Sequence, residues 1–195
     1  MNMNKKILWY LKIAGLALLV GGLLFSGPLL EAHKKAIAQN YAHNLQPVRP
    51  LTNRAAARTE GVPVAINLPH QSIHLAVAKG FFNASNQTWT LSNDKAYFAT
   101  PSALANNQGG NTFIYGHDIA AVFLRLNDVK NGDMAQVTTD NGHLFTYQFR
   151  TWYETSPTDV AIFAYNGPPI LTLQTCSGIW SENRKMLVFD LVEAH

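Results

Sequence analysis

From Val62 onward the chain consists of short runs of β-branched, aromatic and alternating apolar residues, each bounded by turn-forming residues. Such runs are typical of β-strands, because branched and aromatic side chains pack well on a pleated surface. Eight runs occur, at 62–68, 72–78, 88–91, 111–116, 134–139, 143–153, 169–175 and 185–192. Eight short strands at this spacing predict an all-β fold, either a closed barrel or a sandwich.

Two segments between these runs predict specific local structure. Asp140-Asn141-Gly142 separates two runs and predicts a tight hairpin, because Asn-Gly accommodates the positive φ angles of such a turn. Residues 118–126 follow a run and place apolar residues at helical spacing, with Asp118 available as a cap. We therefore expect one or two short helices beside the strands, of which 118–126 is the clearest.

The N-terminal third has a different texture. Residues 13–30 are eighteen residues without a charged side chain, a length that is sufficient for a transmembrane helix. The alternative is a cleaved signal peptide, but the sequence that follows offers a poor small-residue cleavage site. We expect 1–30 to be a cytoplasmic tip and membrane anchor. Residues 31–61 are polar and alanine-rich, and predict a stem and linker leading to a folded domain at 62–195.

Composition limits the domain count and the classes of partner. A chain of 195 residues is long enough for one domain with a substantial core and appendages. Its net charge of +3 arises partly from lysines and arginines in the N-terminal third. The later sequence shows no basic cluster interleaved with aromatic residues, so we expect no nucleic-acid partner. Lysines flank the apolar segment on both sides, so the preference of positive charge for the cytoplasmic side does not set its orientation. We expect the short N-terminus to lie inside the cell and the folded domain outside.

The single cysteine, Cys176, ends the apolar run 169–175 and is followed by a turn. One cysteine cannot form an intramolecular disulfide, although extracellular domains usually pair theirs. The commonest fate of a lone cysteine is burial as a small apolar residue. The alternative is a reactive thiol, which needs a basic or cationic partner.

Two residues stand out as partners for such a thiol. His117 ends the strand-like run 111–116 and precedes the expected helix, a junction where scaffolds commonly present reactive groups, although a structural role is equally open. Arg184 follows Cys176 by eight residues. If the two flanking strands pair with Cys176 opposite Arg184, both side chains share one face and Lys185 takes the other. A slip of one residue would reverse this assignment.

Other candidate residues are weaker. His70 and His74 are four residues apart but lack the glutamate of the zinc-hydrolase motif, so we expect no metal there. Trp89 and Trp152 are assigned to core packing, whereas Trp180, in the loop beside the thiol, is the better candidate for substrate contact. Asp118 could assist His117, but capping is the favoured role.

A cysteine, a histidine and an arginine together suit acyl transfer through a thioester. The motif Thr172-Leu173-Gln174-Thr175-Cys176, the later Arg184 and the pair Gly116-His117 together resemble the sortase family. The segment 126–133 is similar to that family's "L…GD" segment, and the resemblance spans roughly residues 62–193.

The resemblance implies an eight-stranded β-barrel that carries a membrane-anchored cysteine transpeptidase. Sortases cleave an LPxTG-like sorting signal between Thr and Gly, hold the acyl group on cysteine, and transfer it to an amine of the cell wall or of a pilin. Cys176 would then be the nucleophile, His117 the general acid and base, and Arg184 the group that steadies substrate and oxyanion. Thr175 matches a residue that contacts substrate in the family.

The subtype and the rival functions depend on smaller features. Segment 155–169 contains one acid, Asp159, so we expect no calcium site, and no other cofactor is implied. Segment 31–61 lacks an Asp-Pro-aromatic lid, and the loop from Cys176 to Arg184 is short, which favours a class D- or E-like enzyme over a pilus polymerase. The alternatives are a cysteine peptidase that uses water as acceptor, and an inactive, membrane-tethered binding barrel.

Overall fold

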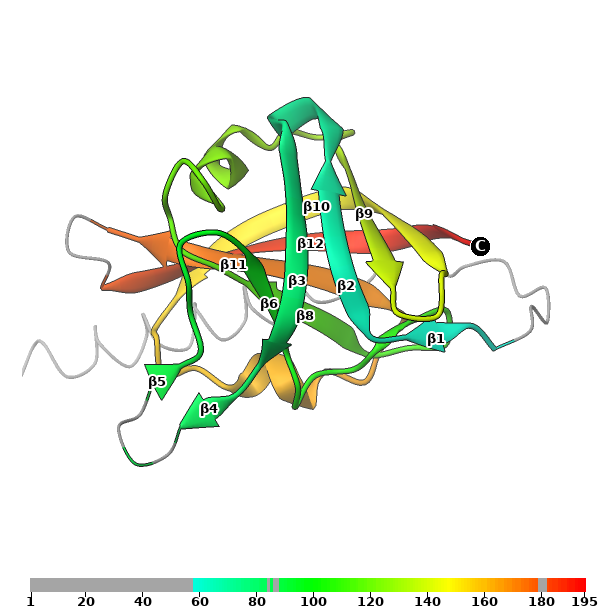
Figure 1. Cartoon of the computed structure of the whole chain (residues 1–195), viewed down its shortest axis with the longest axis horizontal. Coiled ribbons are helices and arrows are strands. Elements are labelled where there is room, and N and C mark those ends of the chain that lie inside the picture. Colours follow the sequence, from blue (N-terminus) through cyan, green and yellow to red (C-terminus); the bar gives the residue numbers. More distant parts are fainter. Residues whose placement is uncertain (1–57, 84, 86–87, 179–181) are drawn as a thin grey trace, which may run out of the picture. The chain divides into compact units, whose positions relative to one another are not determined.

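A closed barrel of eight β-strands forms the centre of the structure, a computed structural model that describes residues 58–83, 85, 88–178 and 182–195 (Figure 1). Around the barrel the strands follow the order β10-β12-β11-β8-β6-β3-β2-β9. Their bounds are β2 Pro63–Leu68, β3 Ile73–Gly80, β6 Ala96–Ala99, β8 Asn111–Tyr115, β9 Met134–Thr139, β10 Leu144–Thr155, β11 Ile170–Ser177 and β12 Asn183–Ala194.

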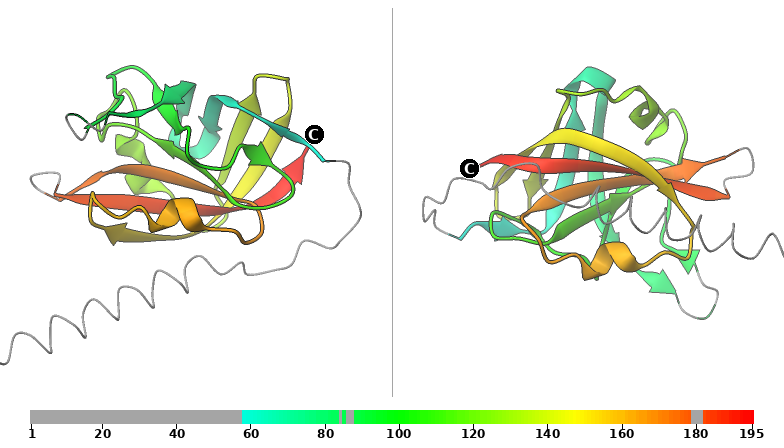
Figure 2. Two further views of the ribbon diagram at one scale, coloured as in Figure 1. Left: turned by 90° about the horizontal axis from the view of Figure 1, so that it is seen from below. Right: turned by 180° about the vertical axis from the view of Figure 1, so that it is seen from behind.

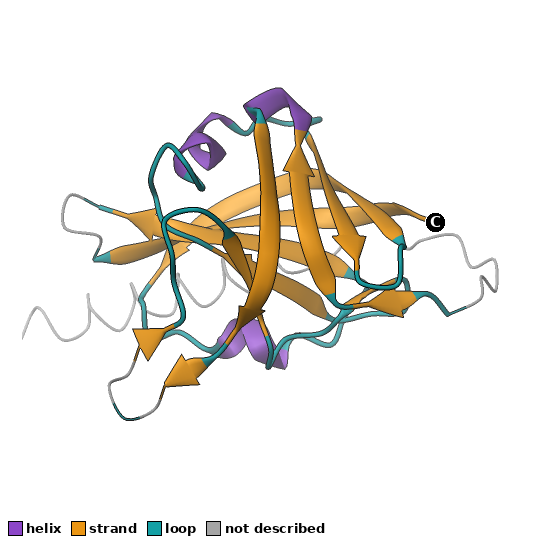
Figure 3. Ribbon diagram, viewed as in Figure 1, coloured by secondary structure: helices purple, strands orange, loops and turns teal. Residues whose placement is uncertain are grey.

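Smaller elements lie outside the barrel (Figure 2). They are two two-stranded sheets, β1 (Glu60–Gly61) with β7 (Ala105–Asn106) and β4 (Phe82–Asn83) with β5 (Thr88–Trp89), and three 3-10 helices, η1 (Pro69–Gln71), η2 (Leu124–Asp128) and η3 (Ala161–Ala164). Strands dominate the described part of the chain, and these short helices occupy its connections (Figure 3).

The expected all-β fold is confirmed as a barrel, with one strand assigned wrongly. Seven of the predicted runs are barrel strands, but Thr88–Trp89 belongs to the outer β4–β5 hairpin. The eighth barrel strand is β6, which pairs in parallel with β3 and antiparallel with β8. All four residues of β6 are buried, so the strand has no alternation of polar and apolar residues that would reveal it in the sequence.

The barrel interior is filled by alternate residues of the long C-terminal strands. Leu171 and Leu173 of β11 meet Leu187 and Phe189 of β12 in one cluster of buried side chains. The connection after β8 contributes to the same cluster, through Val122, Phe123 and Leu126. Because these buried residues are distant in sequence, burial of apolar surface fixes the connection against the barrel.

Residues 118–126 do not form the expected helix. They form consecutive turns that lead into η2, and the Phe123 amide donates to the His117 carbonyl rather than to a helical partner. The apolar side chains turn inward to fill the barrel, and this packing overrides their helical spacing. The predicted cap is wrong as well, because no side chain caps η2 and the Oδ1 atom of Asp118 lacks a hydrogen bond within the described residues.

The predicted hairpin is confirmed between β9 and β10. Gly142 has a φ of 87°, and its amide donates to the Thr139 carbonyl at 3.0 Å. A glycine adopts this left-handed conformation without the steric penalty that other residues incur. The turn sets the antiparallel register in which Leu144 lies opposite Thr138.

The expected anchor at 1–30 and most of the stem at 31–61 lie outside the described residues. Within the described part, none of the helices is both long enough and apolar enough to cross a bilayer.

Candidate active site

Cys176 lies near the end of β11, directly opposite Arg184 in the antiparallel pairing of β11 with β12. This is the register on which the sequence prediction depended, and it is confirmed. The pairs Gln174–Met186 and Thr172–Val188 continue along the same face of the two strands. Cys176 is half-buried, so its thiol is held by the sheet and remains accessible from one side.

His117 reaches the same region because β8 runs parallel to β11. The pairing places Ile114 beside Leu173 and Tyr115 beside Gln174, so the chain leaves β8 next to the last residues of β11. One further hydrogen bond, from the Gly116 amide to the Gln174 carbonyl at 3.1 Å, extends the pairing past the end of β8. His117 follows at once and lines the groove described below.

Thr175 supports this junction from below. Its side chain is fully buried, and its hydroxyl donates to the Gly116 carbonyl at 3.2 Å. Successive residues of a strand point to opposite faces, so the Thr175 side chain points away from the face that carries Cys176. The substrate contact expected of Thr175 from the sequence stays a prediction, and in the structure its hydroxyl bonds the backbone that leads to His117.

Gly116 is packed so closely that no other residue fits without displacement. A Cβ atom at this position would lie 2.7 Å from Cγ1 of Val122 and 3.0 Å from Cδ2 of Phe123. Both of these side chains are buried in the barrel. Gly116 therefore lets the backbone pass in contact with the buried side chains of Val122 and Phe123, and this contact fixes the position of the His117 backbone.

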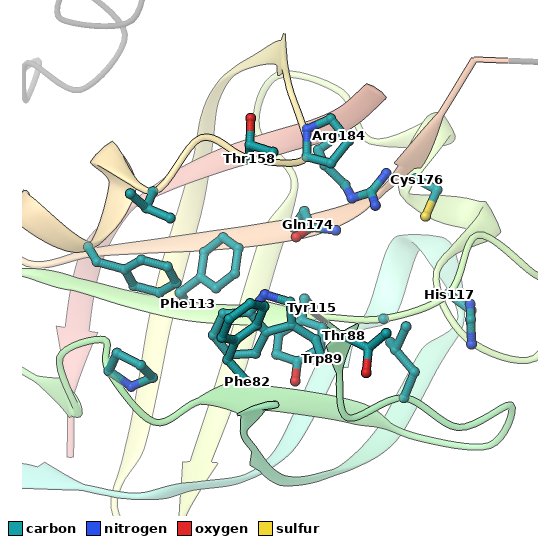
Figure 4. Close-up of a pocket in the computed structure, with 16 residues that line it drawn as sticks. Phe82, Thr88, Trp89, Phe113, Tyr115, His117, Thr158, Gln174, Cys176 and Arg184 are labelled. Atoms are coloured by element: carbon teal, nitrogen blue, oxygen red, sulfur yellow. The ribbon is translucent and has the colours of Figure 1, made fainter. Parts of the chain in front are cut away.

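A groove of about 660 Å³ connects the predicted residues (Figure 4). Cys176, His117 and Arg184 all line it, and they lie together toward one end of the close-up. Most of the remaining lining is apolar and aromatic, with side chains from the β4–β5 hairpin and the segment after it, from β8 and from the β10–β11 connection. These residues are Phe82, Trp89, Leu91, Phe113, Tyr115, Val160 and Phe163.

Trp89 joins the aromatic side chains into one cluster. Its ring centroid lies 5.3 Å from that of Tyr115, 5.5 Å from that of Phe82 and 6.0 Å from that of Phe163. The assignment of Trp89 to core packing is therefore wrong, since the β4–β5 hairpin places it in the groove wall. Burial raises the pKa of Tyr115, so its hydroxyl stays protonated and uncharged at neutral pH.

The opposite face of β12 carries the other cation, Lys185. Its ammonium donates to Oδ1 of Asn127 at 2.7 Å and lies 4.9 Å from the ring centroid of Trp152. Trp152 is 52% exposed, so its predicted core position is also wrong. Burial raises the pKa of Asp118, and the nearby Lys185 charge opposes that shift. Arg184 itself donates to the Asn183 carbonyl at 2.9 Å.

One expected site residue cannot be located, and one residue of the groove was missed. Trp180, the expected substrate contact, lies outside the described residues. Gln174 was quoted in the sequence motif without a role, yet its side chain lines the groove beside the three reactive groups. Within the described ranges, no three His, Cys, Asp or Glu side chains gather as a metal site would require.

Comparison with protein families and solved structures gives a consistent result. A family model described as "Sortase domain" matches residues 66–191. Sortase A from Corynebacterium diphtheriae aligns at 23% identity with a TM-score of 0.56, covering 69% of this chain and 62% of that chain. Sortase A from Listeria monocytogenes aligns at 24% identity with a TM-score of 0.56, covering 69% and 90%.

A third match is sortase E1 from Streptomyces coelicolor, solved with a tripeptide in its active site. It aligns at 20% identity with a TM-score of 0.57, again covering 69% of this chain and 90% of that chain. At these identities the structural matches establish the shared barrel fold. Curated proteins yield no significant match.

Proposed function

Because the chain belongs to the sortase family of cysteine transpeptidases, which act on sorting signals, we propose that Cys176, His117 and Arg184 form its catalytic site. One observation carries this proposal. Three reactive side chains, contributed by the ends of β11 and β12 and by the residue pair after β8, line one end of a single groove. A groove with an apolar remainder suits a peptide substrate, which needs both a reaction centre and side-chain pockets.

In the proposed reaction, the Cys176 thiol transfers its proton to the His117 imidazole, and the thiolate attacks the carbonyl carbon of the scissile peptide bond. The guanidinium of Arg184, directly across the strand pair, stabilises the negative oxygen of the tetrahedral intermediate. The C–N bond then breaks, and the imidazolium of His117 protonates the departing amine. This leaves a thioester between the donor peptide and Cys176.

The second half of the reaction reverses these roles. His117 accepts a proton from the incoming amine, which attacks the thioester carbonyl. Collapse of the second tetrahedral intermediate forms the new amide bond and releases the Cys176 thiolate. We propose an LPxTG-like peptide of secreted proteins as donor and an amine of the cell wall or of a pilin as acceptor.

We further propose that the chain is a single-pass membrane protein with its catalytic barrel outside the cell. The apolar segment 13–30 and the absence of a good cleavage site after it support an uncleaved anchor. The loop from Cys176 to Arg184 is short, and segment 31–61 lacks a lid motif. These features favour a class D- or E-like housekeeping role, while solved sortases of classes A, C, D and E all match the fold.

The direct test incubates the full-length chain with an LPxTG-containing peptide and measures intact mass. We expect an acyl adduct on Cys176, and an added amine should convert that adduct into a new amide product. Cys176→Ala, His117→Ala and Arg184→Ala should each retain the fold by circular dichroism and form no adduct. His143→Ala and Arg58→Ala are matched controls, because neither residue lines the groove, and both should keep normal activity.

Two measurements distinguish the alternatives. A donor that is hydrolysed at equal rates with and without the amine would indicate a cysteine peptidase. A Cys176 thiol that does not react with a peptidyl vinyl sulfone at neutral pH would indicate an inactive binding barrel. Normal turnover by Cys176→Ala would refute the proposed nucleophile.

A further inference from the structure

Gln174 is a polar side chain on the groove surface that the reaction described above does not use. It precedes Cys176 by two residues on the same face of β11, is half-buried, and lines the groove. Its strand neighbours are Met186 on β12 and Tyr115 on β8. The described residues supply no hydrogen-bond partner for its amide group. An amide offers two donors and one acceptor, so a ligand in the groove would find them available.

The position of Gln174 relative to Cys176 matches the repeat of an extended peptide. Alternate residues of a strand are separated by about 6.6 Å along its axis, and a substrate in extended conformation has the same repeat. When such a substrate lies along β11 with its scissile carbonyl at the Cys176 sulfur, the peptide group two residues away lies over Gln174.

His117 indicates which half of the substrate this is. The departing amine must lie within reach of the imidazole that protonates it. In the close-up, Cys176 lies between Gln174 and His117 (Figure 4). Phe113 and Trp89 lie on the same side of Cys176 as Gln174. The leaving segment therefore extends toward His117, and the acyl segment extends over Gln174 toward the aromatic cluster.

We propose that Gln174 is a substrate-binding residue whose Nε2 amide donates a hydrogen bond to the main-chain carbonyl of the third acyl-donor residue, counted back from the scissile carbonyl. The inference rests on the proposed function. Through this hydrogen bond Gln174 recognises an extended backbone rather than a particular side chain. Proline at the third position, as in an LPxTG-like signal, would be accepted, since proline keeps its carbonyl and lacks only the N–H.

The test combines a side-chain change with a backbone change in the donor. Gln174→Met keeps the side-chain length and removes both hydrogen-bonding groups, while Gln174→Glu keeps the shape and removes the donor. The donor is an LPxTG peptide, or an analogue in which the carbonyl of the third residue back from the scissile bond, the proline, belongs to an ester instead of a peptide bond. An ester carbonyl is a weaker hydrogen-bond acceptor. For the wild type we expect the ester to lower kcat/KM by roughly threefold to tenfold.

The two changes should not add. Both variants should lose roughly threefold to tenfold in kcat/KM with the normal peptide and lose little more with the ester, which shows that the same contact has been removed twice. Alkylation of Cys176 by iodoacetamide should proceed at the wild-type rate in the uncharged variant Gln174→Met, because this small reagent needs no contact with Gln174. An altered alkylation rate would instead assign Gln174 to thiol activation and refute the backbone contact.

The outcomes that overturn the inference are distinct from those that overturn the proposed function. An equal ester penalty in wild type and Gln174→Met, with a normal adduct on Cys176, would refute the contact at Gln174 alone. If wild type forms no adduct with the LPxTG peptide, the proposed function fails, and the inference fails with it.

Discussion

Gly116→Ala tests whether the close packing of Gly116 against the barrel core positions His117, the proposed general acid and base. The added methyl group would lie 2.7 Å from Cγ1 of Val122, and ordinary contact begins at 3.4 Å, so one side must move by about 0.7 Å. Val122 and Phe123 are 2% and 0% exposed, so neither has room to withdraw. The backbone at Gly116 should therefore move, together with His117.

Gly116→Ala should lower both the stability of the barrel and the rate of adduct formation. Overpacking of this kind costs about 1–3 kcal/mol of unfolding free energy. Misplacement of a catalytic group by about 1 Å can lower the rate about a hundredfold, so a displacement of about 0.7 Å should lower adduct formation roughly tenfold to a hundredfold. The loss should appear chiefly in kcat, because the groove that binds the donor is largely unchanged.

The measurement is the rate of Cys176 adduct formation, paired with urea unfolding of the same protein. Val122→Ala in the Gly116→Ala background removes the nearest clash, and it should restore part of the rate while lowering stability further. Adduct formation by Gly116→Ala at the wild-type rate would refute the reasoning. So would a double variant that is no faster than Gly116→Ala.

Three further predictions concern the support of the site, the groove wall and the half-buried carboxyl of Asp118. Thr175→Val removes the hydroxyl that bonds Gly116, so it should cost about 1 kcal/mol in urea unfolding and slow adduct formation; Thr172→Val, whose buried hydroxyl has no partner among the described residues, should cost nothing. Trp89→Ala should raise KM for the donor peptide with little change in thiol alkylation, whereas exposed Trp152→Ala should leave KM unchanged. Burial raises the pKa of Asp118, so ionisation of this carboxyl opposes folding, and the folded state loses stability as the pH rises through that pKa. Asp118→Asn should therefore be more stable than wild type at pH 7, with the difference disappearing near pH 3. A difference that grew on acidification would contradict this.

Local patterns predicted much of the fold. Seven barrel strands were visible in the sequence because alternating or β-branched runs report a pleated surface with one buried face. The β9–β10 hairpin was visible because Asn141-Gly142 encodes its turn geometry. Strand β6 was not visible, since a strand buried on both faces shows no alternation. The helix expected at 118–126 failed because barrel packing outweighed a weak local preference.

The sequence also identified the candidate residues Cys176, His117 and Arg184, through their types and their positions at the ends of strand-like runs. It could not place them in one groove, because strand register and the parallel neighbour of β11 are long-range properties. For the same reason the groove wall was missed. Trp89 reaches the site through a hairpin outside the barrel, and no local signal distinguishes that position from a core strand.

By itself, then, the sequence determined which segments extend, where one turn lies and which side chains have the chemistry for acyl transfer, because these depend on near neighbours in the chain. Only the tertiary structure decided that Cys176 faces the groove while Thr175 is buried, and that the Gln174 side chain lines the same groove as the thiol. The pairing of β11 with β8 and β12 sets those directions, and it is stabilised by apolar burial contributed from across the whole barrel.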